Sequence, residues 1–263
     1  MATRYSEYGT DLIKEAGFVT SGMGLFLSWL GVISAEYDNY DELGKISIAS
    51  YAPMASYHIQ DAVMIPKRSS STDNDKLKDA LVKYGGLTVH IYGASANNEY
   101  YNPDTCAQYY NGKDVGNHFV TLVGWDDNYS RDNFKIKPEG DGAWICKNSW
   151  GTDWGENGYF YVSYYDTTFA RYTESVGYII NNTENYTTLY QYDIGDIGQY
   201  FKDNGEIISF VNSFEAIDTE LIKAVGTYFE NPNEDYTINV YVNNLLLYTQ
   251  TGKSTHGGFE TIK

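Results

Sequence analysis

The spacing of hydrophobic and polar residues predicts two helices in the first third of the chain. From residue 22 onward the apolar side chains Met23, Phe26, Leu27 and Leu30 recur at helical spacing and Gly31 follows as a stop, which indicates one short buried helix. A second helix is predicted to begin after Thr72 or Asp73, either of which can cap its N-terminus, and to end at Gly85. The apolar face of this second helix consists of Leu77, Ala80, Leu81 and Tyr84.

After the second helix the pattern changes to strands. Residues 118–124, 143–147 and 159–165 are runs of β-branched and aromatic residues, separated by segments rich in Asp, Asn and Gly. We therefore expect helices followed by an antiparallel sheet. Residues 236–243 alternate strictly between apolar and polar side chains, so that one face is buried and the other faces water, as in a β-sandwich.

Two domains of unequal size are predicted. A chain of 263 residues is long for one compact domain, since domains of ~100 to 200 residues are usual. From residue 185 onward no helical spacing recurs, and the polar segment 181–188 marks the change. The fold class is therefore α+β, with a first domain over residues 1–184 and an all-β domain over residues 185–263. We expect the second domain to be truncated, since the chain ends within a predicted strand.

The net charge of −17 argues against two classes of partner. Nucleic acid and anionic membranes bind proteins mainly through Lys and Arg, so neither is an expected partner. The longest apolar stretch, residues 22–33, is too short for a membrane-spanning helix, which needs ~20 residues. The first 17 residues lack the basic and apolar segments of a secretion signal, so we expect any such signal to lie upstream of this chain.

Cysteine and acidic residues predict no metal site and no cofactor. The two cysteines, Cys106 and Cys146, form neither a disulfide framework nor a pair of metal ligands. We expect both to be small buried residues, with a disulfide between them as the alternative. Residues 126–132 place polar side chains at every second position, as in a calcium loop, but Arg131 stands where such a loop needs glycine.

Two motifs carry the candidate chemistry: GNHFVTLVGWDD at residues 116–127 and GAWICKNSWGTDWGENGYFYVSYY at residues 142–165. Both resemble the papain family of cysteine peptidases. The resemblance implies that His118 is the catalytic base and later the acid, that Asn148 holds its ring, and that Trp150 shields their hydrogen bond. A lone histidine is more often a buried residue bonded to a carbonyl, and an asparagine before glycine a turn residue. The double match favours the catalytic interpretation.

The resemblance extends over residues 17–165 and implies further site residues. Gly22 and Met23 occupy the place of a glycine-rich stretch that lines the substrate cleft in the family. We expect Asn117 and Phe119, on either side of the catalytic histidine, to line the same cleft. Relatives commonly carry a small residue at the position of Phe119, in the wall of the pocket for the second side chain of the substrate. A phenyl ring there predicts a narrower pocket.

Other details are similar to a prokaryotic branch of the family. They are VGWDDNYSRDNF before the second motif, the YYD at residues 164–166 and the YQYD at residues 190–193. In that branch a lectin-like β-sandwich follows the peptidase, on proteins exported to the cell surface. The resemblance thus implies an extracellular or cell-surface location, and a cell-wall or surface glycan as a candidate partner of residues 185–263.

The main departure from the family is the nucleophile. In papain relatives the catalytic cysteine lies ~130 to 150 residues before the histidine, and counting back from His118 passes Met1. We therefore expect an incomplete papain-like fold, in a cysteine peptidase that hydrolyses polypeptides, to which this chain supplies His118 and Asn148 and which is inactive as given. The alternative is a non-catalytic, adhesin-like binding protein derived from a peptidase. A Gly-x-Cys-Trp segment encoded upstream would favour the first.

Overall fold

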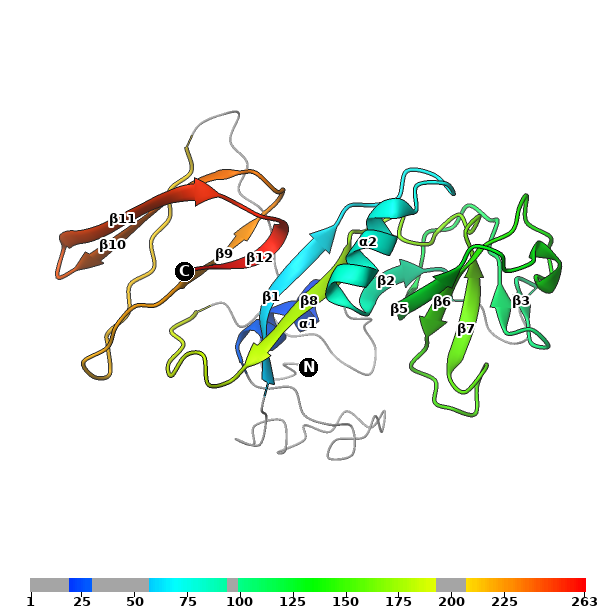
Figure 1. Cartoon of the computed structure of the whole chain (residues 1–263), viewed down its shortest axis with the longest axis horizontal. Helices are drawn as coiled ribbons and strands as arrows, with labels where there is room; N and C mark the ends of the chain where they lie inside the picture. The colour runs from blue at the N-terminus through cyan, green and yellow to red at the C-terminus, as the bar shows by residue number, and fades with distance from the viewer. Residues whose placement is uncertain (1–18, 30–56, 94–98, 193–206) are drawn as a thin grey trace. The chain divides into compact units, whose positions relative to one another are not determined.

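The computed structural model describes residues 19–29, 57–93, 99–192 and 207–263, and Figure 1 shows their helices and strands in chain order. The chain divides into two compact units. Unit 1 consists of Met1–Val63 and Ile179–Lys263, and unit 2 consists of Met64–Tyr178. The domain boundary expected at residue 185 stays a prediction.

Unit 2 is built on a mixed β-sheet with strand order β3-β4-β7-β6-β5-β2-β8. The bounds of these strands are β2 (Leu87–Ile91), β3 (Tyr101–Asn102), β4 (Ala107–Gln108), β5 (His118–Asp126), β6 (Ala143–Lys147), β7 (Tyr159–Ser163) and β8 (Ser175–Asn182), the last of which continues into unit 1. The three strands predicted between residues 118 and 165 are β5, β6 and β7.

One pairing corrects the expectation of a purely antiparallel sheet. Strand β4 runs parallel to β7. Parallel neighbours need a long connection, and here the chain between them contains β5 and β6, which supply it. The antiparallel pairs β2–β5, β5–β6 and β6–β7 follow the prediction.

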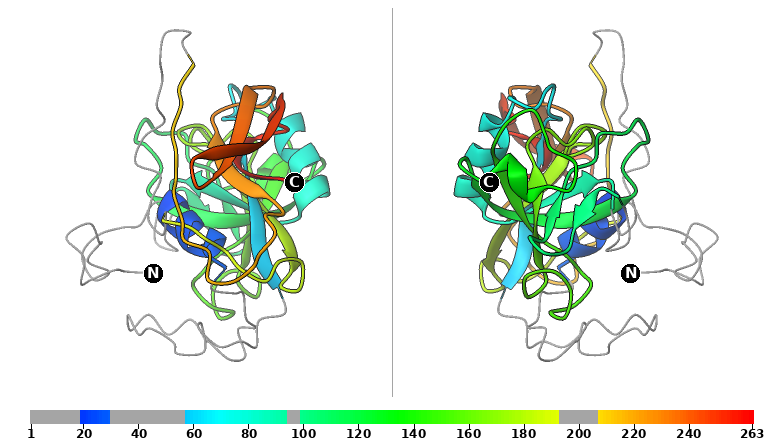
Figure 2. Two further views of the ribbon diagram at one scale, coloured as in Figure 1. Left: turned by 90° about the vertical axis from the view of Figure 1, so that its left-hand side faces the viewer. Right: turned by 90° about the vertical axis from the view of Figure 1, so that its right-hand side faces the viewer.

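Helix α2 (Asp75–Tyr84) lies against β2 and β5, as Figures 1 and 2 show. It buries Leu77, Ala80 and Leu81, three of the four residues in the predicted apolar face. The helix ends at Gly85 as predicted, because Gly85 has a φ of 82° and its N–H donates to the Leu81 carbonyl at 3.0 Å.

The predicted cap of α2 is wrong. The N-terminal cap is Asn74, and its side chain makes no capping hydrogen bond. Its Oδ1 instead accepts a hydrogen bond from Nη2 of Arg68 at 2.6 Å. The carboxylate of Asp73 accepts from the backbone N–H and the hydroxyl of Ser69, so Asp73 stabilises the turn before the helix.

Arg68 is a buried cation that joins distant parts of unit 2. Only 4% of its surface is exposed, and its guanidinium donates to the carbonyls of Tyr164 at 2.9 Å and Phe169 at 3.3 Å. Burial lowers its pKa to about 10, with a smaller contribution from the charge of Arg171. The guanidinium carbon lies 5.3 Å from the centre of the Trp144 ring. Arg68 therefore fastens the start of α2 to the turn after β7.

That turn is also held by a buried carboxylate. Asp166 accepts hydrogen bonds from the N–H groups of Tyr110, Thr168 and Phe169, at 2.8 to 3.1 Å, and from the Thr168 hydroxyl at 2.7 Å. Burial raises its pKa, and the hydrogen bonds oppose that rise. Residues 164–170 are thus ordered by polar groups that reach them from other elements.

Unit 1 contains helix α1 and a three-stranded arrangement. Helix α1 (Val19–Leu27) overlaps the first predicted helix but begins and ends earlier, and it buries Met23 and Leu27, whereas Phe26 of the predicted apolar face is exposed. Strand β1 (Tyr57–Ile65), which ends in unit 2, is followed in the sheet order by β12 (Gly257–Ile262) and β9 (Val225–Phe229). The side-chain amide of Gln60 donates to the Thr261 hydroxyl at 2.6 Å, which links β1 to β12.

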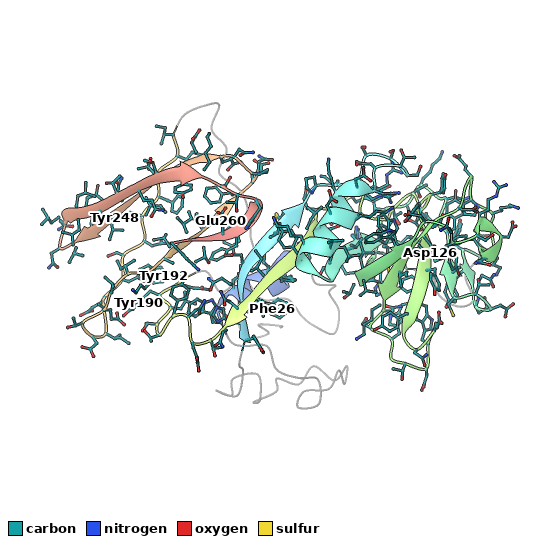
Figure 3. All side chains as sticks on the ribbon, in the orientation of Figure 1. Phe26, Asp126, Tyr190, Tyr192, Tyr248 and Glu260 are labelled. Atoms are coloured by element: carbon teal, nitrogen blue, oxygen red, sulfur yellow. The ribbon has the colours of Figure 1, made fainter. Side chains whose placement is uncertain are left out.

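The remaining described strands, β10 (Asp235–Val242) and β11 (Leu245–Lys253), form a separate antiparallel hairpin. Along β10 the half-buried Tyr236, Ile238 and Val240 alternate with exposed residues, as predicted. Val242, predicted on the same buried face, is exposed, since the register shifts between Val240 and Tyr241. Elsewhere in unit 1, Tyr190 and Tyr192 lie beside Phe214, and Figure 3 shows the two tyrosine side chains close together. Every regular element among the described residues after 185 is a strand, which confirms a β-rich region.

Candidate active site

The two residues expected to form a catalytic pair meet at the ends of neighbouring strands. His118 is the first residue of β5, and Asn148 directly follows β6, which pairs with β5 in the antiparallel direction. Nε2 of His118 lies 2.8 Å from Oδ1 of Asn148. The hydrogen bond predicted between these side chains is therefore present, although 30 positions separate them in the sequence.

The surroundings of Asn148 indicate which ring nitrogen of His118 carries the proton. Oδ1 of Asn148 also accepts a hydrogen bond from the N–H of Ser149 at 2.9 Å, which identifies this atom as the amide oxygen. An amide oxygen only accepts, so Nε2 of His118 is the donor. In the neutral ring the lone pair then lies on Nδ1, which leaves Nδ1 able to take a proton from another group.

Aromatic rings surround this hydrogen bond. The ring of Trp150 stacks on the imidazole of His118, with centroids 5.3 Å apart and an angle of 29° between the planes. Trp154 meets Trp150 edge to face at 4.9 Å and stacks on Tyr101 at 5.4 Å. Trp150 is 40% exposed and Asn148 only 8% exposed. The indole thus limits the access of water to the bond, which strengthens it electrostatically.

Glycines shape the turn that carries Asn148 and Trp150. Gly155 has a φ of 63°, and a Cβ there would lie 2.5 Å from the Tyr159 carbonyl oxygen. Gly158 has a φ of 88°, and its carbonyl accepts from the Asn148 N–H at 2.9 Å. Residues with side chains rarely adopt these conformations, so the glycines permit the tight return of the chain to β7.

The other predicted site residues lie in different parts of the chain. Asn117 is exposed, and its Oδ1 accepts from the Gly93 N–H at 2.8 Å. Phe119 is half-buried and contacts the ring of His90. Gly22 and Met23 belong to α1 in unit 1, where Met23 is fully buried. That these four residues line a substrate cleft stays a prediction.

Both cysteines are free thiols and lie far from His118. Cys106 precedes β4, three strands away from β5, and at ~4.8 Å per strand this amounts to about 14 Å across the sheet. Cys146 on β6 pairs with Leu122, four residues along β5 from His118, or about 13 Å at ~3.3 Å per residue. Neither sulfur is placed to exchange a proton with the imidazole.

The two thiols differ in their environment. Cys146 is buried as predicted, whereas Cys106 is partly exposed because it lies in the short turn between β3 and β4, with a φ of 50°. Burial, with a smaller effect from the charge of Asp166, raises the pKa of the Cys146 thiol well above its usual range. Cys146 is therefore a poor nucleophile, since the thiolate is the reactive form.

This contrast predicts the reaction of the protein with a disulfide reagent such as DTNB at pH 8. We expect one thiol, Cys106, to react rapidly in the folded chain, and Cys146 to react only at the rate of unfolding. Cys106→Ser should remove the rapid phase and leave the slow one. Rapid reaction of both thiols in the folded chain would contradict the buried environment of Cys146.

The polar loop after β5 forms ion pairs with lysines. Asp127 binds Lys78 at 2.5 Å and accepts a hydrogen bond from the Tyr164 hydroxyl at 2.7 Å, and Asp132 pairs with Lys137. Within the described ranges there is no cluster of three or more His, Cys, Asp or Glu side chains suited to a metal ion. The helices that the structure describes are also too short to cross a bilayer.

Comparison with known proteins identifies the family. Residues 16–180, more than half of the chain, match the family described as papain family cysteine protease. The chain belongs to the papain family. His118 and Asn148, with the motifs that contain them, lie within the matched segment.

Relatives and solved structures agree with this assignment. The chain is 30% identical over 177 residues to falcipain-3 of Plasmodium falciparum, covering 60% of this chain and 32% of the relative. It is 29% identical over 140 residues to cathepsin B-like CP1 of Giardia intestinalis, covering 52% and 43%. The chain thus spans less than half the length of these curated relatives.

The fold is also similar to a solved structure of the cysteine protease and lectin-like domains of Cwp84, described as a surface layer associated protein of Clostridium difficile. The TM-score is 0.67 at 23% identity, and the match covers 91% of this chain and 54% of that one. A second structure of Cwp84, after propeptide cleavage, gives a TM-score of 0.66 at 21% identity, covering 94% and 62%. The chain therefore has an α+β, papain-like fold with a β-rich region.

Proposed function

We propose that this chain supplies the general base of a cysteine peptidase, His118, and the asparagine that orients it, Asn148, and that the nucleophilic thiol comes from polypeptide outside residues 1–263. The observation that carries the proposal is the hydrogen bond of 2.8 Å between His118 and Asn148, beneath the ring of Trp150, in a chain of the papain family. The positions of Cys106 and Cys146, both far along or across the sheet from His118, support the second part.

The tautomer of His118, with Nε2 donating to Asn148, defines the proposed mechanism. Nδ1 takes the proton of the thiol, and the thiolate attacks the carbonyl carbon of the scissile peptide bond. The imidazolium then gives its proton to the leaving amine as the carbon–nitrogen bond breaks, which leaves an acyl-thioester. Nδ1 next removes a proton from water, whose oxygen attacks the carbonyl carbon of the thioester. The carbon–sulfur bond breaks, the acid product leaves and ionises, and the sulfur departs as thiolate and takes the proton back from the imidazolium. Asn148 keeps the ring in one orientation and one tautomer throughout.

The proposed substrate is a polypeptide, as for the family. We also propose that the protein acts outside the cell or on its surface, and that residues 185–263 form a lectin-like domain that binds a cell-wall or surface glycan. The similarity of fold to Cwp84 supports this part. Sedimentation with insoluble cell-wall polysaccharide tests the proposed glycan binding. The assay compares the whole chain with a variant that lacks residues 207–263, and binding through these residues predicts that only the whole chain sediments with the polysaccharide.

The test of the peptidase compares two proteins. The first is the 263-residue chain, and the second is the product that also includes the codons upstream of Met1. We expect the 263-residue chain to show no thiol-dependent hydrolysis of fluorogenic peptides and no labelling by a peptidyl epoxide that alkylates activated thiolates. The longer product should show both, because it would contain the missing thiol.

Two results would overturn the proposal. Hydrolysis by the 263-residue chain that is lost in Cys106→Ser or Cys146→Ser would assign the nucleophile to that cysteine. A longer product that binds peptides but neither hydrolyses them nor reacts with the epoxide would favour the non-catalytic binding protein.

A further inference from the structure

His90 lies next to the candidate catalytic histidine, at the same end of the β2–β5 strand pair. In the antiparallel register His90 is opposite Phe119, and Ile91 is opposite His118. The rings of His90 and Phe119 are in contact, with centroids 4.8 Å apart and an angle of 34° between their planes. Ile91 is the last residue of β2 and His118 the first of β5, so both histidines lie at this end of the strands, with their side chains on opposite faces. A peptide that passes over the strand ends, rather than along one face, can reach both rings.

The backbone around His90 is closely fitted to its ring. A Cβ on Gly116 would lie 2.7 Å from Cε1 and 2.9 Å from Nδ1 of His90, so only glycine fits there. The His90 carbonyl accepts from the Ala170 N–H at 3.0 Å, and the Ile91 carbonyl accepts from the Asn117 N–H at 2.9 Å. The ring is therefore fixed on its Nδ1 side.

The two ring nitrogens of His90 have different environments. Nδ1 is buried beside the backbone of Gly116, and no hydrogen bond of normal geometry reaches it from the described residues. The residue as a whole is only partly buried, so the solvent-exposed part of His90 lies elsewhere than at Nδ1. A half-exposed, rigidly held imidazole beside a phenyl ring is a contact surface with one polar group at its edge.

We propose that His90 is a specificity-determining residue of the peptidase, and that its Nε2 edge, with the ring of Phe119, binds an acidic substrate side chain near the scissile bond in acidic solution. The proposal rests on the proposed function, because it assumes that a peptide lies beside His118. Phe119 narrows the contact surface, which favours aspartate, the shorter acidic side chain.

The charge of His90 explains why the preference should depend on pH. Burial lowers the pKa of His90, the positive charge of His118 adds to the effect, and the Gly116 backbone opposes it. His90 is therefore neutral at neutral pH and becomes a cation only below the ordinary histidine pKa of 6.5. A bound carboxylate stabilises the cation and raises the pKa of His90, so acidic peptides and protons should bind together.

Two charged side chains on the elements around His90 have partners of their own. On α2, Lys78 pairs with Asp127. Arg171, which follows Ala170, donates to the Ser69 carbonyl. On β5 the titratable group that acts on His90 is His118. In the part of the chain that the structure describes, no carboxylate acts on His90, so its positive charge would be free to bind one from a substrate.

The main test uses the longer, hydrolytically active product and two peptides that differ only by aspartate or asparagine. The varied residue is the second before the scissile bond, the position assigned to Phe119 from the resemblance. We expect the ratio of kcat/KM for the aspartate peptide to that for the asparagine peptide to rise about 3- to 10-fold from pH 7.5 to pH 5.5, as for a partly exposed ion pair. Aspartate remains ionised at both values.

Matched variants separate His90 from the rest of the protein. His90→Gln and His90→Phe should both abolish the rise, since neither side chain takes a proton, while His90→Phe keeps an aromatic ring against Phe119. His256→Gln, which changes a histidine of unit 1, should retain the rise in the ratio at low pH. An equal rise in the wild type and both His90 variants, or no rise in the wild type, would overturn the proposal.

A second measurement does not require hydrolysis. On the 263-residue chain, the Cε1–H proton signal of His90 can be followed by NMR at pH 5.5 while either peptide is added. We expect a shift with the aspartate peptide that is absent with the asparagine peptide. If the aspartate peptide shifts the signal but the longer product does not hydrolyse peptides, the contact between His90 and aspartate is established and the proposed peptidase function is refuted. Equal responses to both peptides would refute the contact.

Discussion

Arg68→Ala is expected to destabilise unit 2 by ~3 to 5 kcal/mol, the range for loss of one partner from a buried, hydrogen-bonded charge network. The substitution removes the donors to the carbonyls of Tyr164 and Phe169 and to the side chain of Asn74. Each buried acceptor left without a partner costs ~1 to 3 kcal/mol. The carboxylate of Asp166, whose negative charge favours protonated Arg68, would also lose its cation.

The measurement is urea denaturation followed by tryptophan fluorescence, because Trp144 lies beside the guanidinium. Arg171→Ala is the matched control, since the half-buried Arg171 side chain donates to the Ser69 carbonyl at 2.7 Å in a solvent-exposed hydrogen bond. We expect it to cost less than ~1 kcal/mol. Arg68→Lys keeps the charge but not the planar set of donors, so it should be intermediate and remain folded. Equal stability of Arg68→Ala and Arg171→Ala would refute the role assigned to Arg68.

His118→Ala is expected to lower kcat/KM of the longer product by ~10² to 10⁴-fold, the contribution typical of general acid–base catalysis. The alanine removes the group that takes the proton of the thiol, so the nucleophile stays in its unreactive form. Asn148→Ala should cause a smaller loss, because the imidazole remains but loses the hydrogen bond that holds its ring.

The double variant distinguishes a joint role from two separate ones. If Asn148 acts through His118, the double variant should be no slower than His118→Ala, since residues that act as a unit are strongly non-additive. His256→Gln serves as the control for loss of a histidine elsewhere, and circular dichroism of each variant checks folding. Losses that add in the double variant would show that Asn148 acts independently of His118.

The fold of unit 2 was predictable where periodicity is strong. Strand β6 was predicted with the bounds it has, and β5 began at His118 as expected, because β-branched and aromatic residues there are bounded by polar turns. The cap of α2 was not predictable. Asn74 lies in a polar run that offers several capping residues, and its side chain is taken by Arg68, whose position depends on residues almost 100 positions later.

Arg68 itself looks like a solvated charge in the sequence. It lies among serine, threonine and aspartate, and such a setting normally indicates an exposed loop. Its burial follows from carbonyls at Tyr164 and Phe169, which are 96 and 101 positions away. Contacts of that range leave no local pattern, so neither Arg68 nor the buried Asp166 could be assigned from the chain around it.

The candidate site was also predictable only in part. Two motifs, each with a distinctive order of residues, pointed to His118 and Asn148, and the structure places these side chains within hydrogen-bond distance. The contact of His90 with Phe119 depends on the register between β2 and β5. A shift of one residue would have turned His90 to the other face of the sheet, and the sequence of β2 alone does not specify that register.

The adjacency of β5 and β6 has a consequence for recombination between related peptidases. Because His118 begins β5 and Asn148 directly follows the next strand, β6, the whole imidazole–amide contact is encoded by one contiguous segment of the gene. Crossovers outside that segment transfer the contact intact into a chimera, together with the indole that covers it. Crossovers within the polar loop between β5 and β6 combine the histidine of one parent with the asparagine of the other. Shuffled libraries of this family should therefore lose activity most often at junctions in that loop.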